Sequence, residues 1–178
     1  MGGLWRFVLY LTRLLVRAAS CSQKQQLPQF IADQKHHFNV TVDLLFGQSH
    51  KNNNTAGLGL WLNGALKLVE SVQKAGGETP VFRFDVEYNP TAADAYRVLK
   101  MAAYVRETVD NASVDPKPKI AWALDIASML PVSTSYAPCP APGFDNRTTL
   151  IGDCFWQLVD HVDIMDFRFA LPTRTLSW

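Results

Sequence analysis

A short stretch of strict alternation constrains the fold of this chain more than any other feature. From Val81 to Tyr88, apolar side chains occupy every second position, and charged side chains follow one another on the opposite face. The apolar set is Phe82, Phe84, Val86 and Tyr88, and the charged set is Arg83, Asp85 and Glu87. This period of two predicts a β-strand. Because buried charges are unfavourable unless they are paired or functional, the charged face predicts either a site or a structural ion-pair network.

Three further strands and three helices are predicted along the chain. Their approximate ranges are 38–46, 120–126 and 161–169 for the strands, and 58–74, 92–109 and 150–159 for the helices, with Thr91 as an N-cap. Residues 22–33 are a polar stretch, and residues 129–152 are predicted to have irregular structure. Strands that alternate with helices predict an α/β fold with a parallel sheet.

The acidic residues of these strands predict a shared edge of the sheet. Asp43, Asp85, Asp125 and Asp166 fall late in the four predicted strands. Right-handed crossovers bring the carboxyl ends of parallel strands to one rim, where catalytic (β/α) barrels carry their active sites. Four strands are about half of such a barrel, so we expect a parallel, TIM-barrel-like domain, apparently incomplete, over residues 22–178.

Composition and the first residues bear on the class of protein. With 48% hydrophobic residues and a net charge of +1, the chain is typical of a globular protein and offers no basic surface for nucleic acid. Residues 1–21 are apolar, contain several arginines and lack acidic residues, which is typical of a secretory signal or of an organellar transit segment. They are short for a membrane span, so membrane contact is expected only through this leader if it stays uncleaved.

Sequons and cysteines favour the secretory route. Four Asn-x-Ser/Thr acceptors are present, at Asn39, Asn53, Asn111 and Asn146. In an oxidising compartment, Cys139 and Cys154 would form a disulfide that closes a loop of 15 residues, worth about 3 kcal/mol in the chain-entropy model; otherwise the cysteines are free thiols. No metal-spaced His/Cys cluster or Gly-rich phosphate loop appears, so neither a metal nor a cofactor is expected.

The order of three short motifs resembles the middle of a glycoside-hydrolase-type TIM barrel of the family 18 chitinase superfamily. The motifs are Phe84-Asp-Val-Glu-Tyr88, Ala123-Leu-Asp-Ile-Ala-Ser-Met-Leu-Pro131 and Val162-Asp-Ile-Met-Asp-Phe-Arg168. The resemblance is closest to poorly characterised secreted members, and it implies a carbohydrate ligand, Glu87 as the general acid and Asp85 as its partner. Two earlier Asp positions of the family pattern are Pro80 and Arg83 here, and Phe167 stands where the family has Tyr.

Further residues are candidates for substrate binding. Asp125 shares a strand face with two alanines, which leaves room for a ligand. The other candidates are Arg83, Met165, Asp166, Phe167 and Arg168. The departures from the family pattern keep two alternatives open beside a polysaccharide-cleaving enzyme: a non-catalytic carbohydrate-binding protein, and a structural fragment without activity of its own.

Overall fold

A parallel four-stranded sheet forms the centre of the molecule. The structure is a computed structural model that describes residues 26–33, 42–48, 55–86, 89–125 and 131–165. The strands are β1 (Asp43–Gln48), β2 (Val81–Val86), β3 (Ile120–Asp125) and β6 (His161–Met165), in the order β1-β2-β3-β6. All three neighbouring pairs are parallel, which confirms the predicted α/β class with a parallel sheet.

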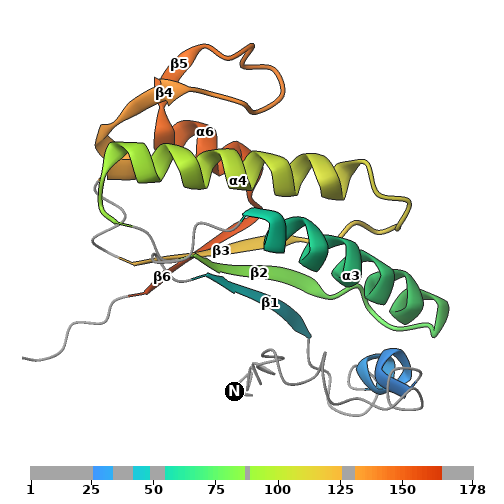
Figure 1. Cartoon of the computed structure of the whole chain (residues 1–178). Helices are drawn as coiled ribbons and strands as arrows, with labels where there is room; N and C mark the ends of the chain where they lie inside the picture. Colours follow the sequence, from blue (N-terminus) through green and yellow to red (C-terminus); the bar gives the residue numbers. More distant parts are fainter. Residues whose placement is uncertain (1–25, 34–41, 49–54, 87–88, 126–130, 166–178) are drawn as a thin grey trace, which may run out of the picture.

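Three helices cover one face of this sheet. They are α3 (Thr55–Lys74), α4 (Ala92–Asp110) and α6 (Ile151–Leu158), and all lie on the same side of the strands (Figure 1). The predicted cap is present, since the Thr91 side chain accepts a hydrogen bond from the backbone N–H of Asp94. The opposite side of the sheet, which we call the helix-free face, carries none of these three helices.

The alternation of β2 divides its residues between these two faces. Phe82, Phe84 and Val86 are buried under the helices, whereas Arg83 and Asp85 between them remain partly exposed. The Phe84 ring stacks on Trp122 of β3 at 4.8 Å, and Trp61 of α3 meets Phe84 edge-on at 5.4 Å. Both tryptophans therefore pack in the core between the sheet and the helices.

The helical segment 26–33 was not predicted from the sequence. It lies near the amino ends of the strands (blue in Figure 1), with Ile31 and Ala32 buried. The contact requires Gly77, because a Cβ atom there would lie 2.8 Å from the Ala32 Cα and 2.7 Å from a Val72 methyl. The sequence did not predict this segment because its composition is mostly polar, and its packing depends on burial of Ile31 and Ala32 and on the close approach of Ala32 to Gly77.

A small antiparallel hairpin occupies the region that was predicted to be irregular. It consists of β4 (Tyr136–Pro138) and β5 (Thr148–Leu150), and it lies beyond the helices, away from the sheet (Figure 1). The Cys139–Cys154 disulfide predicted from the sequence is present and joins the hairpin to α6. Both cysteines are fully buried, so the hairpin is fixed against the helical layer.

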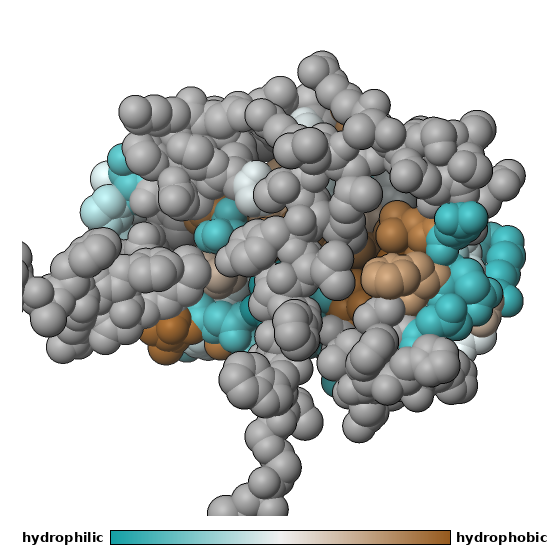
Figure 2. All heavy atoms as spheres, turned by 90° about the horizontal axis from the view of Figure 1, so that it is seen from below, coloured by the Kyte–Doolittle hydropathy of each residue, from teal (hydrophilic) through white to brown (hydrophobic). Residues whose placement is uncertain are grey.

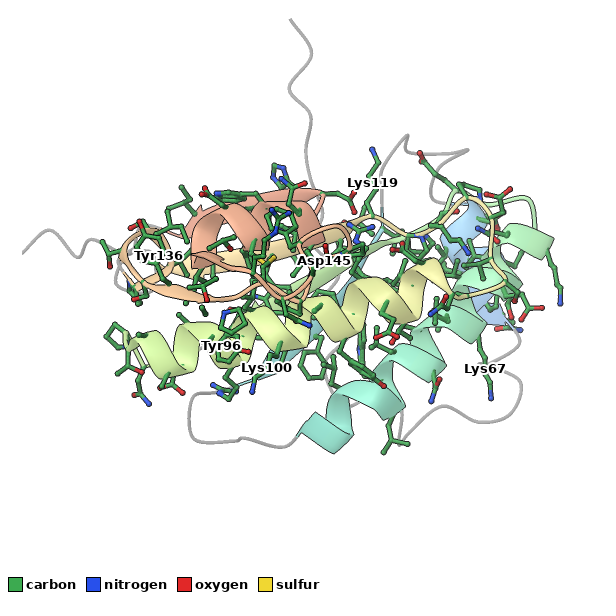
Figure 3. All side chains as sticks on the ribbon, turned by 90° about the horizontal axis from the view of Figure 1, so that it is seen from above. Lys67, Tyr96, Lys100, Lys119, Tyr136 and Asp145 are labelled. Atoms are coloured by element: carbon green, nitrogen blue, oxygen red, sulfur yellow. A yellow bond between two sulfur atoms is a disulfide. The ribbon has the colours of Figure 1, made fainter. Side chains whose placement is uncertain are left out.

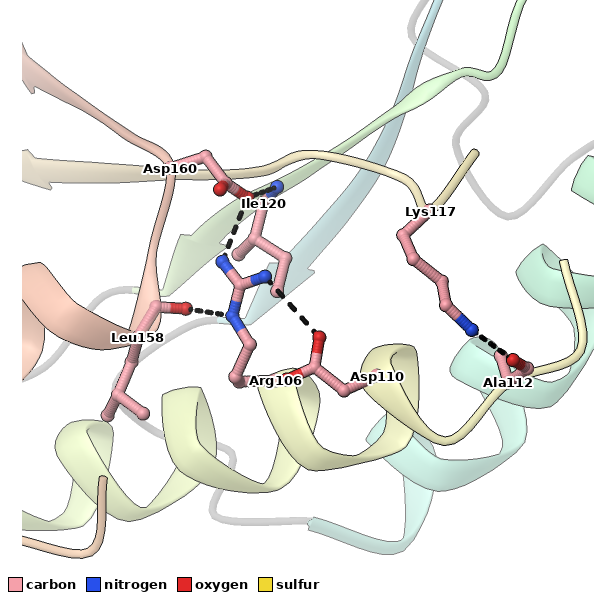
Figure 4. Close-up of polar contacts among 7 residues, drawn as sticks. All are labelled: Arg106, Asp110, Ala112, Lys117, Ile120, Leu158 and Asp160. Atoms are coloured by element: carbon pink, nitrogen blue, oxygen red, sulfur yellow. Dashed lines mark hydrogen bonds and ion pairs between the residues drawn. The ribbon is translucent and has the colours of Figure 1, made fainter. Parts of the chain in front are cut away.

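A polar cluster ties α4 to the amino ends of β3 and β6 (Figure 4). One Asp160 side-chain oxygen accepts hydrogen bonds from the backbone N–H of Ile120 and from Arg106 Nη2, both at 2.8 Å. Arg106 Nε also donates to the carbonyl oxygen of Leu158 at 2.9 Å. These bonds satisfy backbone groups that would otherwise be left without partners where β3 and β6 begin.

Candidate functional site

The candidate site lies on the helix-free face of the sheet. Arg83 and Asp85 come from β2, and the strand register places Gly47 of β1 and Ala123 of β3 on either side of Asp85. These neighbours have small side chains or none, so they project little above the sheet on either side of Asp85. Figure 2 shows this side of the molecule, where both hydrophilic and hydrophobic surface of the described residues is visible.

Arg83 is held by two carboxylates from different strands. Its Nε donates to Asp43 Oδ2 of β1 at 2.7 Å, and its Nη1 forms an ion pair with Asp163 Oδ2 of β6. The side chains of Arg83, Asp43 and Asp163 are 17%, 14% and 29% exposed. Both carboxylates come from strands other than β2, so the ion pairs of Arg83 extend beyond the network of Arg83, Asp85 and Glu87 that the sequence suggested.

Small residues on β3 allow Arg83 to reach Asp163. Two strand spacings, about 9.6 Å, separate β2 from β6. The β3 residues in register with Arg83 and Asp85 are Ala121 and Ala123, whose side chains leave the space above β3 free for the guanidinium. The network continues on β6, because His161 Nε2 lies 3.0 Å from Asp163 Oδ1. It thus connects both edge strands of the sheet.

This network sets the electrostatic character of the face. Two carboxylates surround one guanidinium, so the positive charge of Arg83 is compensated within the protein. A site for an anionic ligand needs an uncompensated cation or free N–H donors. Arg83 therefore offers no uncompensated charge to an anionic ligand on this face.

The position of Asp43 corrects one prediction. The sequence placed Asp43 late in a strand over 38–46, but it is the first residue of β1, which runs on to Gln48. The strand continues because Gly47 and Gln48 pair in register with Asp85 and Val86 of β2, and this pairing outweighs the tendency of Gly47 to end a strand. Asp43 accordingly lies away from the carboxyl rim.

The other predicted residues fall into two groups. Asp125 and Met165 are the last residues of β3 and β6 and are register partners, so their backbones lie side by side at the carboxyl ends. Glu87, Asp166, Phe167 and Arg168 lie outside the described residues, as do the sequons at Asn39 and Asn53. Asn111 and Asn146 are described and exposed.

Asp163 and His161 belong to the site but were not predicted from the sequence. The usable signal was the spacing of His161, Asp163 and Met165, which places three positions of β6 on one face. This spacing alone does not indicate that Arg83 is the ion-pair partner of Asp163, because the two residues are 80 positions apart in the sequence. They meet only in the folded sheet, where β3 lies between their strands.

Comparison of the chain with protein-family models, with curated proteins and with solved structures finds no match. Over residues 26–33, 42–48, 55–86, 89–125 and 131–165, no three His, Cys, Asp or Glu side chains are grouped so that they could ligate a metal ion. Within the same ranges, none of the helices has the length and hydrophobicity needed to span a bilayer.

Proposed function

We propose that the chain is a secreted, glycoside-hydrolase-like protein with a TIM-barrel-like arrangement of its parallel sheet. In this proposal Glu87 is the general acid that protonates the glycosidic oxygen of a polysaccharide, and Asp85 is its partner. The observation that carries the proposal is the division of β2, which buries Phe82, Phe84 and Val86 under helices and leaves Arg83 and Asp85 on the helix-free face.

That division supports the proposal because helices cover the outer face of a (β/α) barrel strand, while the inner face lines the site. Asp85 is the second-last residue of β2, so it lies near the carboxyl end, where barrel enzymes present catalytic groups. Continued alternation predicts that Glu87, two residues further along, belongs to the same face. Most glycoside hydrolases use a pair of carboxyl groups as their catalytic groups.

The secretory route has its own support. A disulfide such as Cys139–Cys154 is typical of proteins in an oxidising compartment, which supports this route. The sequons at Asn111 and Asn146 are exposed, as acceptors of glycans have to be.

A second candidate function is non-catalytic carbohydrate binding. The ion pairs of Arg83 with Asp43 and Asp163 favour it, because they occupy the middle of the helix-free face with charges that are already paired. Such a face can still bind neutral sugars through hydrogen bonds at its carboxyl rim.

The substitution Glu87→Gln separates the two functions. The amide keeps the shape of the side chain but cannot donate an acidic proton, so hydrolysis of a responsive polysaccharide should fall about 10²–10⁴-fold while the protein stays folded. Hydrolysis is measured as reducing ends released from a panel of neutral polysaccharides that includes chitin, with the melting temperature recorded on the same preparation.

Two results would contradict the catalytic role. Retained hydrolysis with a large drop in melting temperature would make Glu87 a structural residue. If the parent protein cleaves nothing on the panel but is retarded by one of these polysaccharides in affinity electrophoresis, the non-catalytic binding function is correct.

A further inference from the structure

An open groove of about 540 Å³ lies on the helical side of the molecule, on the other side of the sheet from the helix-free face. One wall is the outward side of α4, and the other is the segment Pro140–Pro142 that follows Cys139. In Figure 3 the view is onto this surface, and Lys100 projects from α4. The groove is separate from the candidate site on the helix-free face.

The residues of the α4 wall follow helical spacing. Lys100, Tyr104, Glu107 and Asn111 recur at intervals of four, three and four, which places them in one row on the same side of the helix. The row combines an aromatic ring that is 47% exposed with polar side chains. An aromatic ring beside hydrogen-bonding groups suits a pyranose, which has an apolar ring face and polar edges.

Asn111 is the last member of this row and begins the sequon Asn111-Ala112-Ser113. It is exposed at the end of α4, where its backbone N–H donates to the Glu107 carbonyl oxygen at 3.0 Å. Tyr104 lies seven residues earlier, two helical turns or about 10.5 Å along the axis. A glycan attached to Asn111 would therefore emerge directly into the groove, within reach of Tyr104.

We propose that the groove is an intramolecular seat for the N-linked glycan of Asn111, whose first N-acetylglucosamine residues pack between Tyr104 and Pro142. The acetamido methyl and the ring faces contact the apolar walls, and the hydroxyl groups exchange hydrogen bonds with Lys100, Glu107 and Asp110. This inference depends on the secretory route of the proposed function.

Both walls of the groove are cross-linked to the rest of the fold without any glycan, and such preorganisation favours binding. The disulfide fixes the proline-containing wall to α6, and the backbone N–H of Cys139 donates to the Arg147 carbonyl oxygen at 2.9 Å. On the other wall, Arg106 is held by the Leu158 carbonyl oxygen and by Asp160. The sequon at Asn146 differs, because it lies in the turn of the hairpin and does not line the groove.

The test uses the whole chain expressed through a secretory pathway, with glycan occupancy read by mass spectrometry. Ser113→Ala removes the acceptor at Asn111 without changing Asn111, and Thr148→Ala does the same for Asn146. Ser113→Ala should lower the melting temperature by about 2–4 °C, whereas Thr148→Ala should change it by less than about 1 °C.

A second pair of variants tests the contact itself. In a Tyr104→Ser background, Ser113→Ala should no longer lower the melting temperature, because the ring that the glycan contacts is gone. If Tyr104→Ser folds poorly, Pro142→Ser removes the opposite wall and should shrink the same difference.

Three outcomes would overturn the glycan seat. An equal effect of Ser113→Ala with and without Tyr104, or no effect in either background, would show that the glycan does not contact the groove. An empty Asn111 beside an occupied Asn146 would refute the seat and leave the secretory route intact. If none of the four sequons, at Asn39, Asn53, Asn111 and Asn146, carries a glycan, both the seat and the secretory route fail.

Discussion

Replacement of Arg83 by Met tests whether the ion pairs on the helix-free face stabilise the sheet. Methionine keeps the aliphatic part of the side chain but leaves Asp43 and Asp163, which are 14% and 29% exposed, without their shared cation. Removing one partner of a fully buried ion pair costs about 3–5 kcal/mol, and an exposed pair contributes about 0–1 kcal/mol. For these partly exposed partners we expect a loss of about 2–3 kcal/mol in the free energy of unfolding.

Thermal unfolding with the disulfide intact measures this loss. For a chain of this length, the expected loss corresponds to a drop in melting temperature of about 4–12 °C. Lys74→Met is the matched control, because it removes a lysine that pairs with Glu70 at 2.6 Å on the open surface of α3. The hydrogen bond and charge of Lys74 lower the pKa of Glu70, yet both groups are solvated, and the melting temperature should stay at the parent value.

A rescue experiment identifies the cause of the loss. Asp43→Asn and Asp163→Asn together in the Arg83→Met chain should recover most of the lost stability, because no uncompensated carboxylate remains. Two results would contradict this explanation. One is a melting temperature of Arg83→Met equal to that of the Lys74→Met control, and the other is a further loss of stability when both carboxylates are neutralised.

Two other substitutions test the contacts at the amino ends of the strands. Asp160→Ala should lower the free energy of unfolding by about 1–3 kcal/mol, because the buried N–H of Ile120 loses its acceptor. Asp160→Asn keeps an oxygen at this position and should lower the free energy of unfolding by less. Equal losses for the two variants in urea unfolding would contradict this. Gly77→Ala should cost about 1–3 kcal/mol, because the new methyl group meets Ala32 and Val72. Gly64→Ala, with open space around its Cβ position in α3, should instead stabilise the chain by about 0.5–1 kcal/mol. If both substitutions change the free energy of unfolding in the same direction, the packing explanation is wrong.

Local patterns predicted most of the elements. The alternation from Val81 gave β2 and both of its faces, and the helix predicted over 58–74 corresponds to most of α3. The Thr91 cap and the short α6 also follow from residues within one or two turns of each other. These features were predictable because neighbouring residues determine them.

Elements stabilised by distant partners were not predicted. The β4–β5 hairpin has strands of three residues each, too short for a visible period, and the disulfide to α6 holds it in place. Segment 26–33 packs through Ala32 onto Gly77, a glycine more than 40 positions away.

The sequence by itself determined that β2 has an apolar and a charged face, that strands alternate with helices, and that Cys139 and Cys154 are the two cysteines that follow the leader. Only the tertiary structure decided which charges meet. Arg83 finds Asp43 and Asp163, 40 and 80 positions away, because parallel pairing sets their strands in register and two alanines on β3 leave the path open. Alternation assigns a side chain to a face, but its partners there depend on strand order and on the size of the side chains between them.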